Sequence, residues 1–400
     1  MQAINEPIAN VILGNPDDAI SAAPLKPFDN SVLEFFNDLS KRLIKEREYP
    51  EVATFGFWCR KASLLKEKEN YNDLDARLGR GVVFHSTPSN VPVNFAYSFA
   101  AGLLAGNANI VRLPGKDFEQ VTIIVEAIRE LLSGEHKLLK PYLNFIKYPP
   151  DKKLHVKYSS LCDVRIIWGG DETIKEIREA PLKPKATELT FADRYSIAVI
   201  NADEYLKAND KPKIAQDFYN DTYLSDQNAC TSPRIVFWLG ACREAAKEKF
   251  WESVGALARE KYELAPVQAV GKLNAFYKAA AGLNTTQEPS MCTLINAGDN
   301  YVTRIKVKKA DENLMQYKYN SGFFFEMDID VLTDILPICA DRLQTLTYYG
   351  ISQEDIINFI SKYKPKGIDR AVPMGKSMDF ALTWDGYDLI RELSRKVSVF

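Results

Sequence analysis

Short strand-like runs alternate with helix-like segments through the first half of this chain, and this alternation constrains its fold more than any other feature. The runs are rich in Val, Ile, Phe and Trp, and several of them end in loops that contain Gly or Pro. They cover residues 81–85, 108–114, 164–168 and 195–200. A strand–helix–strand order predicts a doubly wound, mainly parallel sheet, which is an α/β fold.

Three loops follow strands of this predicted sheet. They cover residues 86–92, 113–117 and 169–172. Because ligands of doubly wound sheets bind at the carboxyl ends of the strands, we expect a small-molecule site at these loops. The chain contains no GxGxxG sequence, so the usual dinucleotide fingerprint is absent and a nucleotide site has to be inferred from other residues.

A second lobe is expected because 400 residues exceed the size at which one hydrophobic core usually keeps growing. A helical stretch at 208–223 is followed by a polar loop, a strand-like run at 234–239 and an amphipathic helix at about 241–263. Two or three further strand-like runs lie between residues 290 and 326. We therefore predict a second α/β domain at 205–350, after a first domain at 1–204 and before a C-terminal segment at 351–400.

Composition and charge exclude several classes of protein. The formal net charge of −2 gives no bulk electrostatic reason to bind nucleic acid or an anionic membrane. The six cysteines form no CxxC pair and the three histidines are scattered, so no metal site is predicted. No apolar run reaches the roughly 20 residues of a membrane span, and the N-terminus does not resemble a signal peptide. We expect a cytoplasmic protein with reduced thiols.

Cys230 lies in the polar loop Ser225–Pro233, just before the strand-like run. A catalytic thiol needs exposure, a lowered pKa and donors for an oxyanion, and such a loop could present one at the edge of a sheet. The alternative is a small buried cysteine with no chemistry. For Cys242, Cys292 and Cys339, which have apolar or helical neighbours, that alternative is favoured.

Polar residues in the other loops are further candidates, each with a simpler structural alternative. The amide of Asn90 could stabilise an oxyanion or could cap a helix. Arg112 and Lys116 could bind a ribose or the 2′-phosphate of NADP, or could be surface charges. The pair Gly169-Gly170 could let a cofactor approach the backbone or could form a turn. Glu188 could act as a general base or could be solvated.

Three blocks of sequence together resemble the aldehyde dehydrogenase superfamily, and within it the LuxC-type acyl-CoA reductases. The first runs from His85 to Pro92 and continues, after a helix, at 106–112. The second is Asp226–Pro233, and the third is Gly367–Gly375 with Trp384–Asp388. The blocks occur in the order of the family and span about 80 to 390.

This resemblance implies a fold and a set of roles. The first domain becomes the NAD(P)-binding domain, the second carries the nucleophile, and the C-terminal segment returns to the cofactor region. Cys230 falls on the nucleophile of the family, Asn90 on its oxyanion asparagine and Glu188 near its general base. Pro88, Arg112, Lys116, Gly169 and Gly170 fall in the cofactor region.

The reaction implied is the NADPH-dependent reduction of an acyl-CoA, or another acyl thioester, to the aldehyde through an acyl-enzyme on Cys230. NAD remains possible as the cofactor, an acyl-donor protein as a partner, and a homo-oligomer is expected by analogy. Two alternatives stay open. One is an aldehyde dehydrogenase that forms an acid or acyl-CoA, and the other is a non-redox acyl carrier or transferase subunit.

Overall fold

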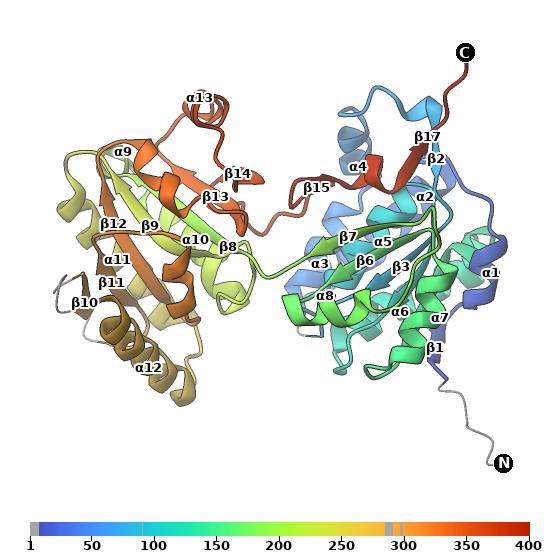
Figure 1. Ribbon diagram of the computed structural model, residues 1–400, viewed down its shortest axis with the longest axis horizontal. Helices are drawn as coiled ribbons and strands as arrows, with labels where there is room; N and C mark the ends of the chain where they lie inside the picture. The colour runs from blue at the N-terminus through green and yellow to red at the C-terminus, as the bar shows by residue number, and fades with distance from the viewer. Residues whose placement is uncertain (1–7, 90, 285–290, 297–298) are drawn as a thin grey trace. The chain divides into compact units, whose positions relative to one another are not determined.

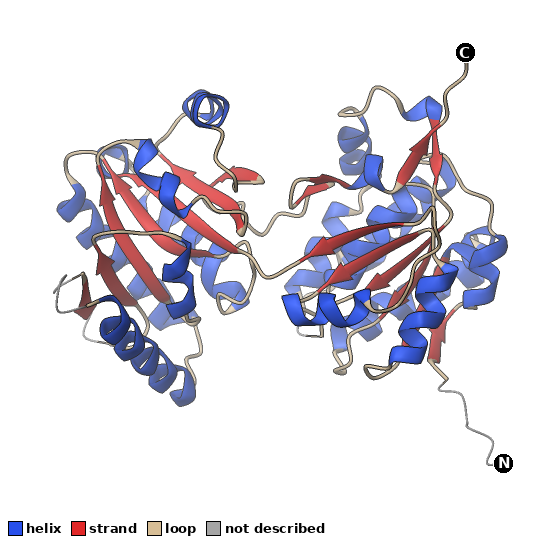
Figure 2. Ribbon diagram, in the orientation of Figure 1, coloured by secondary structure: helices blue, strands red, loops and turns tan. Residues whose placement is uncertain are grey.

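The computed structural model describes residues 8–89, 91–284, 291–296 and 299–400. The chain divides into two compact units, of which unit 1 comprises Met1–Ala192 and Phe380–Phe400 and unit 2 comprises Asp193–Asp379 (Figure 1). Each unit is built on its own sheet, with helices packed on both faces (Figure 2).

The sheet of unit 1 has the strand order β1-β5-β4-β3-β6-β7. Its strands are β1 (Asn10–Leu13), β3 (Val82–Ser86), β4 (Ala108–Arg112), β5 (Leu143–Lys147), β6 (Val164–Trp168) and β7 (Thr187–Phe191). β1 is antiparallel to β5, and the other pairs are parallel. The parallel part of the sheet starts at β3, continues outward through β4 and β5, and then crosses to β6 on the other side of β3. The order therefore reverses between β3 and β6, which is the topological switch point of a doubly wound sheet.

Alternate strand residues face two different helix layers in unit 1. Val83 and Val111 pack in the larger core, and Phe84 and Ile110 pack in the core on the opposite face. The larger core includes α2 (Asn30–Leu43), α3 (Pro50–Trp58), α4 (Lys61–Lys68), α5 (Asn94–Leu104) and α6 (Glu119–Ser133). The opposite face is covered by α1 (Pro16–Ser21), α7 (Lys152–Leu161) and α8 (Asp171–Arg178).

Short elements complete unit 1. The pairs are β15 (Thr383–Trp384) with β16 (Tyr387–Asp388), and β17 (Ser394–Lys396) with β2 (Arg77–Gly79). The last helix is α14 (Leu389–Glu392), and two 3₁₀ helices cover Leu74–Ala76 and Lys137–Tyr142. Because β17 pairs with β2, the end of the chain is anchored on the first unit.

The sheet of unit 2 has the strand order β10-β11-β12-β9-β8-β13-β14. Its strands are β8 (Tyr195–Asn201), β9 (Pro233–Leu239), β10 (Cys292–Asn296), β11 (Thr303–Val307), β12 (Phe323–Ile329), β13 (Leu343–Tyr349) and β14 (Arg370–Pro373). The pairs are parallel except β10 with β11.

Helices cover both faces of this second sheet as well. Ala198, Val236 and Trp238 pack in the core with α9 (Ala202–Lys207), α10 (Lys211–Thr222) and α11 (Arg243–Lys261). On the other face Ile197 and Phe237 pack with α12 (Pro266–Leu283) and α13 (Gln353–Tyr363). Three 3₁₀ helices cover Tyr223–Ser225 (η3), Glu312–Tyr317 (η4) and Leu332–Ile338 (η5).

The α/β fold with two doubly wound sheets agrees with the sequence-based prediction, but the division of the chain does not. We placed the boundary at 204/205, whereas the compact units divide at 192/193 and again at 379/380. The predicted strand at 195–200 is β8, and it belongs to the second sheet, where it pairs with β9 and β13. Its residues are buried on both faces, so periodicity alone cannot tell which sheet it joins.

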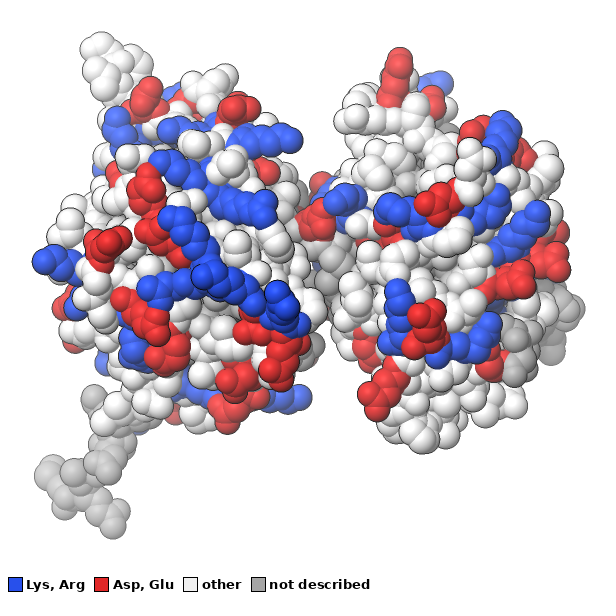
Figure 3. Space-filling model, turned by 180° about the vertical axis from the view of Figure 1, so that it is seen from behind, with Lys and Arg blue, Asp and Glu red and all other residues white. Residues whose placement is uncertain are grey.

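Several elements were not predicted, among them the strands β5 and β13 and the helices α7 and α13. Residues 187–191 form the strand β7, and residues 266–283 form the helix α12. No described helix is long and apolar enough to cross a membrane. On the face shown in Figure 3, basic side chains form a band across unit 1 that acidic side chains border, so neither sign dominates.

Candidate functional site

Cys230 lies in unit 2, in the turn between η3 and β9, and it is half-buried. Ser196 Oγ, at the start of β8, donates a 2.6 Å hydrogen bond to the carbonyl of Cys230. The Ser232 N–H closes the turn by donating to the carbonyl of Ala229 at 3.0 Å. The backbone around the cysteine is therefore held on both sides, at the amino end of the strands β8 and β9.

The turn before Cys230 contains two successive residues in the left-handed region. Asp226 and Gln227 have φ angles of 51° and 55°. Residues other than glycine seldom adopt this conformation, and it persists only where the surroundings hold it in place. Such strain is often found at functional sites.

Side-chain hydrogen bonds hold this turn. The Gln227 Oε1 accepts from the N–H groups of Gly322 (2.9 Å) and Phe323 (3.1 Å). Its Nε2 donates to the carbonyls of Pro233 (3.0 Å) and Phe323 (3.2 Å). The amide thus joins the start of β9 to the start of β12 and is fully buried.

Asp226 ties the same turn to other elements of unit 2. Its carboxylate accepts from Ser321 Oγ (2.7 Å), from Gln268 Nε2 (3.1 Å) and from the Tyr262 hydroxyl. Sequence reasoning proposed Cys230 as the nucleophile but did not identify Gln227, Asp226 and Ser196 as the residues that hold its turn. An acid and an amide directly after a predicted helix could have indicated a hydrogen-bonded turn.

The other cysteines have environments that disfavour a thiolate. Cys59, Cys162, Cys292 and Cys339 are buried, and burial raises the pKa of each thiol, to about 12 for Cys162 and Cys339. Cys242 is exposed, which corrects our expectation of a packed cysteine. It directly precedes α11, and its hydrogen bond with the Asp203 carboxylate raises its pKa. Cys230 therefore differs from the other five in its surroundings.

In unit 1 the three predicted loops leave adjacent strands on the same edge of the sheet. Ser86 at the end of β3 pairs with Arg112 at the end of β4 and with Ile167 near the end of β6. The loops at 86–92, 113–117 and 169–172 therefore begin side by side, at the carboxyl ends of the strands and across the switch point. This is where doubly wound sheets bind their ligands.

Arg112 is only in part available to a ligand. Its Nε and Nη2 donate to the carbonyl of Tyr148 at 3.3 Å, and its guanidinium lies 4.7 Å from the centroid of the Tyr148 ring. Burial lowers the pKa of this arginine from its ordinary value. Lys116, in contrast, is exposed.

The glycine candidates differ from one another. A Cβ atom on Gly170 would meet no atom of the chain within 4 Å, whereas on Gly169 it would touch the Thr173 side chain. Gly170 is therefore not required by packing and leaves its backbone open to a ligand. It directly precedes α8, whose first turn contains the acidic residues Asp171 and Glu172. These acids disfavour a phosphate at this helix terminus.

Glu188 lies on β7 and is engaged in ion pairs. Its Oε2 accepts from Arg165 Nε at 2.7 Å and its Oε1 from Arg178 Nε at 2.6 Å. Arg165 is buried, and it also donates to Ser159 and to two backbone carbonyls. The pairing explains Glu188 as the counter-charge of a buried arginine, a role that the sequence-based general-base expectation did not consider.

Asn90 lies outside the described residues, and Pro88 before it is half-buried. The helix that follows, α5, begins at Asn94 with Val93 in the capping position.

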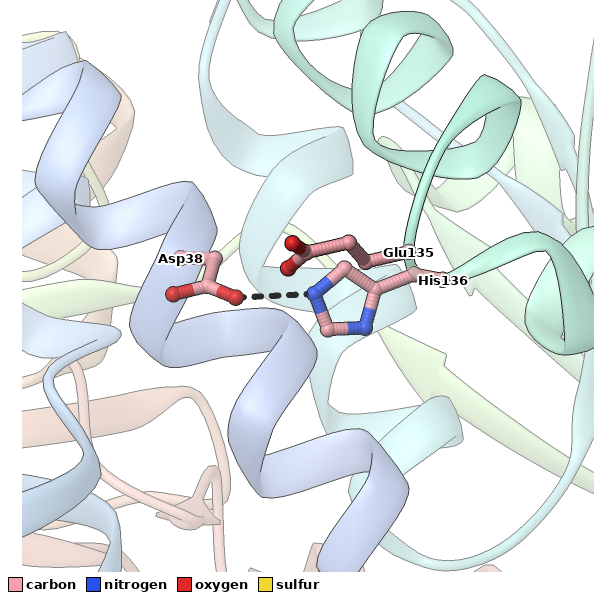
Figure 4. A group of neighbouring side chains, drawn as sticks. All are labelled: Asp38, Glu135 and His136. Carbon is pink, nitrogen blue, oxygen red and sulfur yellow. Dashed lines mark hydrogen bonds and ion pairs between the residues drawn. The ribbon is translucent and has the colours of Figure 1, made fainter.

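One group of described residues lies close enough to share a metal ion. Ligand atoms of Asp38, Glu135 and His136 lie within 4.8 Å of one another (Figure 4). However, Asp38 already accepts from His136 Nε2 at 2.9 Å and from Lys41 Nζ at 2.7 Å. The ammonium of Lys41 lowers the pKa of Asp38 and would repel a second cation. The group is therefore explained by its own ion pairs.

Comparisons of the sequence with known proteins identify a family and two relatives. A family described as "Acyl-CoA reductase (LuxC)" matches residues 60–396. The chain is 23% identical over 306 residues to a long-chain acyl-protein thioester reductase of Aliivibrio fischeri, which covers 75% of this chain and 60% of that protein. It is 27% identical to long-chain acyl-protein thioester reductase 2 of Photobacterium leiognathi, over 41% of this chain and 33% of that protein. The chain thus spans less than two thirds of either relative's length in these matches.

Solved structures share the fold. An NAD-dependent aldehyde dehydrogenase from Sinorhizobium meliloti aligns with a TM-score of 0.64 at 13% identity and covers 97% of this chain and 90% of that one. An NAD-dependent benzaldehyde dehydrogenase from Corynebacterium glutamicum aligns with a TM-score of 0.62 at 13% identity, over 98% and 95%. The family match covers most of the chain, and the fold agrees with it. The protein belongs to the LuxC family of acyl-CoA reductases, and its fold is that of the aldehyde dehydrogenases.

Proposed function

We propose that this protein reduces an acyl thioester to the aldehyde, with NADPH as the reductant and Cys230 as the nucleophile. The observation that carries the proposal is the turn at 226–232. It holds a half-buried cysteine at the amino ends of two strands, in a turn with two left-handed residues that the Gln227 and Ser196 side chains hold in place. Such a turn presents one thiol in a fixed position.

The reaction follows from this thiol. The Cys230 thiolate attacks the carbonyl carbon of the thioester, and the displaced thiolate leaves with a proton, so the acyl group is now bonded to Sγ. The exchange has little driving force in either direction, because both partners are thioesters. A nicotinamide cofactor, when bound, would supply a hydride to this carbonyl carbon. Cys230 then leaves as a thiolate, and the aldehyde is released.

Donors for the oxyanion are assigned by the resemblance. Asn90 takes the role of the family's asparagine, and the backbone N–H of Cys230 supplies a second donor. Preorganised donors of this kind stabilise the charge that develops on the oxygen. No residue is assigned as the base, because both carboxylate oxygens of Glu188 already accept from guanidinium groups.

The residues at the switch point of unit 1 fit a nicotinamide dinucleotide in part. Gly170 leaves its backbone open, and Lys116 is exposed in the loop after β4, where it could contact a 2′-phosphate. The guanidinium of Arg112 donates to the carbonyl of Tyr148 and is therefore only in part available to a cofactor. Pro88 lies in the neighbouring loop, after β3. A preference for NADPH over NADH rests on Lys116, and two of the solved structures that share the fold are named NAD-dependent.

Substrate, partner and location are part of the same proposal. The curated relatives are named acyl-protein thioester reductases, so we propose either an acyl-CoA or an acylated partner protein as donor. We also propose that the protein acts in the cytoplasm as a homo-oligomer.

The experiment is to incubate the purified protein with acyl-CoAs of several chain lengths and NADPH, and to follow NADPH absorbance and aldehyde formation. We expect turnover that Cys230→Ser abolishes and that Cys242→Ser leaves intact. The second variant is the matched control because it removes the other thiol that is not buried. A folded wild-type protein that consumes no NADPH with any acyl thioester would overturn the proposal.

The acyl carrier alternative predicts a different outcome. In that case Cys230 accepts an acyl group from acyl-CoA, a mass change on this cysteine is detected, and no nicotinamide cofactor is consumed.

A further inference from the structure

Arg234 is a buried cation on the strand that follows the cysteine turn. It is the second residue of β9, and 6% of it is exposed. Its Nη1 donates to the carbonyl of Tyr319 at 2.8 Å and to the Oδ1 of Asn320 at 2.7 Å. Asn320 in turn donates from Nδ2 to Asn228 Oδ1 at 2.5 Å. The guanidinium is therefore held in one position and joined to the turn two residues before Cys230.

No carboxylate balances this guanidinium at ion-pair distance within the part of the chain that the structure describes. A buried charge without a counter-ion is costly, and burial accordingly lowers the pKa of Arg234 to about 10. The charged groups that oppose this shift are Cys230 first, and then Asp193 and Asp226. Cys230 precedes Arg234 by four residues, and the hydrogen bonds through Asn320 and Asn228 tie the cation to the cysteine turn, so the thiol is an ionisable group near this cation.

The two acids in this group have other partners. Asp193 pairs with Lys318 at 3.1 Å and with Arg342 at 2.8 Å. Asp226 accepts from the hydroxyl groups of Ser321 and Tyr262 and from Gln268. Cys230 can become an anion beside Arg234 by losing one proton to solvent, which makes it the complement of this cation.

We propose that Arg234 is a positioning residue that favours the thiolate form of Cys230. A fixed cation beside a thiol stabilises the anion and increases its reactivity at neutral pH. This inference rests on the proposed function for its purpose, since it explains how Cys230 could attack a thioester without a dedicated base. The chemistry is a simple ionisation, in which Sγ keeps the electron pair and water takes the proton.

The test measures the rate at which iodoacetamide alkylates Cys230 as a function of pH, with peptide mass spectrometry to read each cysteine separately. An ordinary cysteine thiol has a pKa of about 8.5. We expect the midpoint for wild-type Cys230 to lie at least one pH unit below this value. Arg234→Met should raise the midpoint by about one unit, which lowers the rate near neutral pH about tenfold. Arg234→Lys, which keeps a positive charge, should recover part of the loss.

Two controls separate charge from structure. Asn320→Ala removes the link between the guanidinium and Asn228 but keeps the cation, so the midpoint should stay close to that of the wild type. Cys242 in the same sample is an internal reference, because its contact with Asp203 does not involve Arg234. Circular dichroism establishes whether each variant folds.

Either of two results would overturn the inference: a wild-type midpoint at or above 8.5, or a folded Arg234→Met variant with an unchanged midpoint. The midpoint of the wild-type protein tests the inference even if Arg234→Met does not fold. Alkylation requires neither cofactor nor acyl thioester. A low midpoint in a protein that reduces no thioester would leave this inference standing while the proposed function fails.

Discussion

Arg165 in unit 1 and Arg234 in unit 2 are both buried arginines on strands, and they differ in what faces the guanidinium. Arg165 meets the carboxylate of Glu188, whereas Arg234 donates to a carbonyl and an amide oxygen. A paired guanidinium contributes to the fold alone. An unpaired one beside a thiol shifts the ionisation of that thiol. Among the described residues, we therefore connect Arg234 with chemistry and Arg165 with the fold.

The largest effect that tests this difference between the two arginines is a loss of unfolding free energy in unit 1. Arg165→Met leaves Glu188 without its buried partner, and breaking such a pair typically costs about 3–5 kcal/mol of unfolding free energy. Hydrogen exchange of the strands β6 and β7 should report this loss. The matched control is Arg178→Met, which removes the other partner of Glu188. Arg178 is 57% exposed on its side chain, so we expect a loss below about 1 kcal/mol. Equal losses in the two variants would contradict this difference.

A second, smaller effect concerns the neutral side chains that hold the cysteine turn. Gln227→Ala leaves the buried N–H groups of Gly322 and Phe323 without their acceptor, at a cost of about 2–4 kcal/mol. Urea unfolding of the variant measures this loss of unfolding free energy, and hydrogen exchange in β9 and β12 locates it. Asn228→Ala is the control, because Asn228 is exposed and we expect less than about 1 kcal/mol. If the two variants were equally stable, the amide of Gln227 would not be what holds the turn.

Unit 2 also contains a buried acid that no cation balances among the described ion pairs. Asp221 accepts from the N–H groups of Gly375 (2.7 Å) and Ser377 (2.9 Å), and burial raises its pKa to about 6. A folded pKa above the unfolded value of 3.8 means that the folded state binds the proton more tightly. The stabilisation is complete below pH 3.8 and is lost as the pH rises through about 6.

This linkage predicts that unit 2 loses about 2–3 kcal/mol of unfolding free energy between those pH values. Asp221→Asn should remove this component, so the difference in stability between the variant and the wild type should change with pH over this range. Urea titrations of both proteins at a series of pH values measure it. A difference that stays constant with pH would show that Asp221 titrates as an ordinary exposed acid.

The sequence predicted the two-sheet α/β fold because the strand-like runs of both units are apolar and are bounded by turn residues. It predicted the strand-end loops of unit 1 for the same reason, since those loops directly follow the runs. It assigned β8 to the wrong sheet, because a strand buried on both faces has the same pattern in either. It left α12 unassigned.

The environment of the candidate residues could not be predicted, because it depends on partners far apart in the chain. Arg165 and Glu188 meet because β6 and β7 pair in a register that places them side by side. Arg234 is buried against Tyr319 and Asn320, which come 85 and 86 residues later. One signal was present in the sequence. An arginine within an apolar run, as in Val164-Arg165-Ile166-Ile167, requires a partner, and that requirement could have directed attention to Glu188 as its counter-charge.

The smallest expected effect is that of a substitution at Glu188 on the rate of acyl-CoA reduction. Glu188→Gln removes the charge of the candidate base but keeps a side chain of similar size. Because Glu188 is committed to Arg165 and Arg178, we expect acyl-CoA reduction by the folded variant to change less than twofold. NADPH consumption at saturating acyl-CoA, with stability measured in parallel, provides the readout. An aldehyde dehydrogenase that hydrolyses its acyl-enzyme needs such a base, so a loss above tenfold would return Glu188 to the active site and favour that alternative. An unchanged rate would show that Glu188 serves the fold of unit 1 as the counter-charge of Arg165 and is not the base of the reaction.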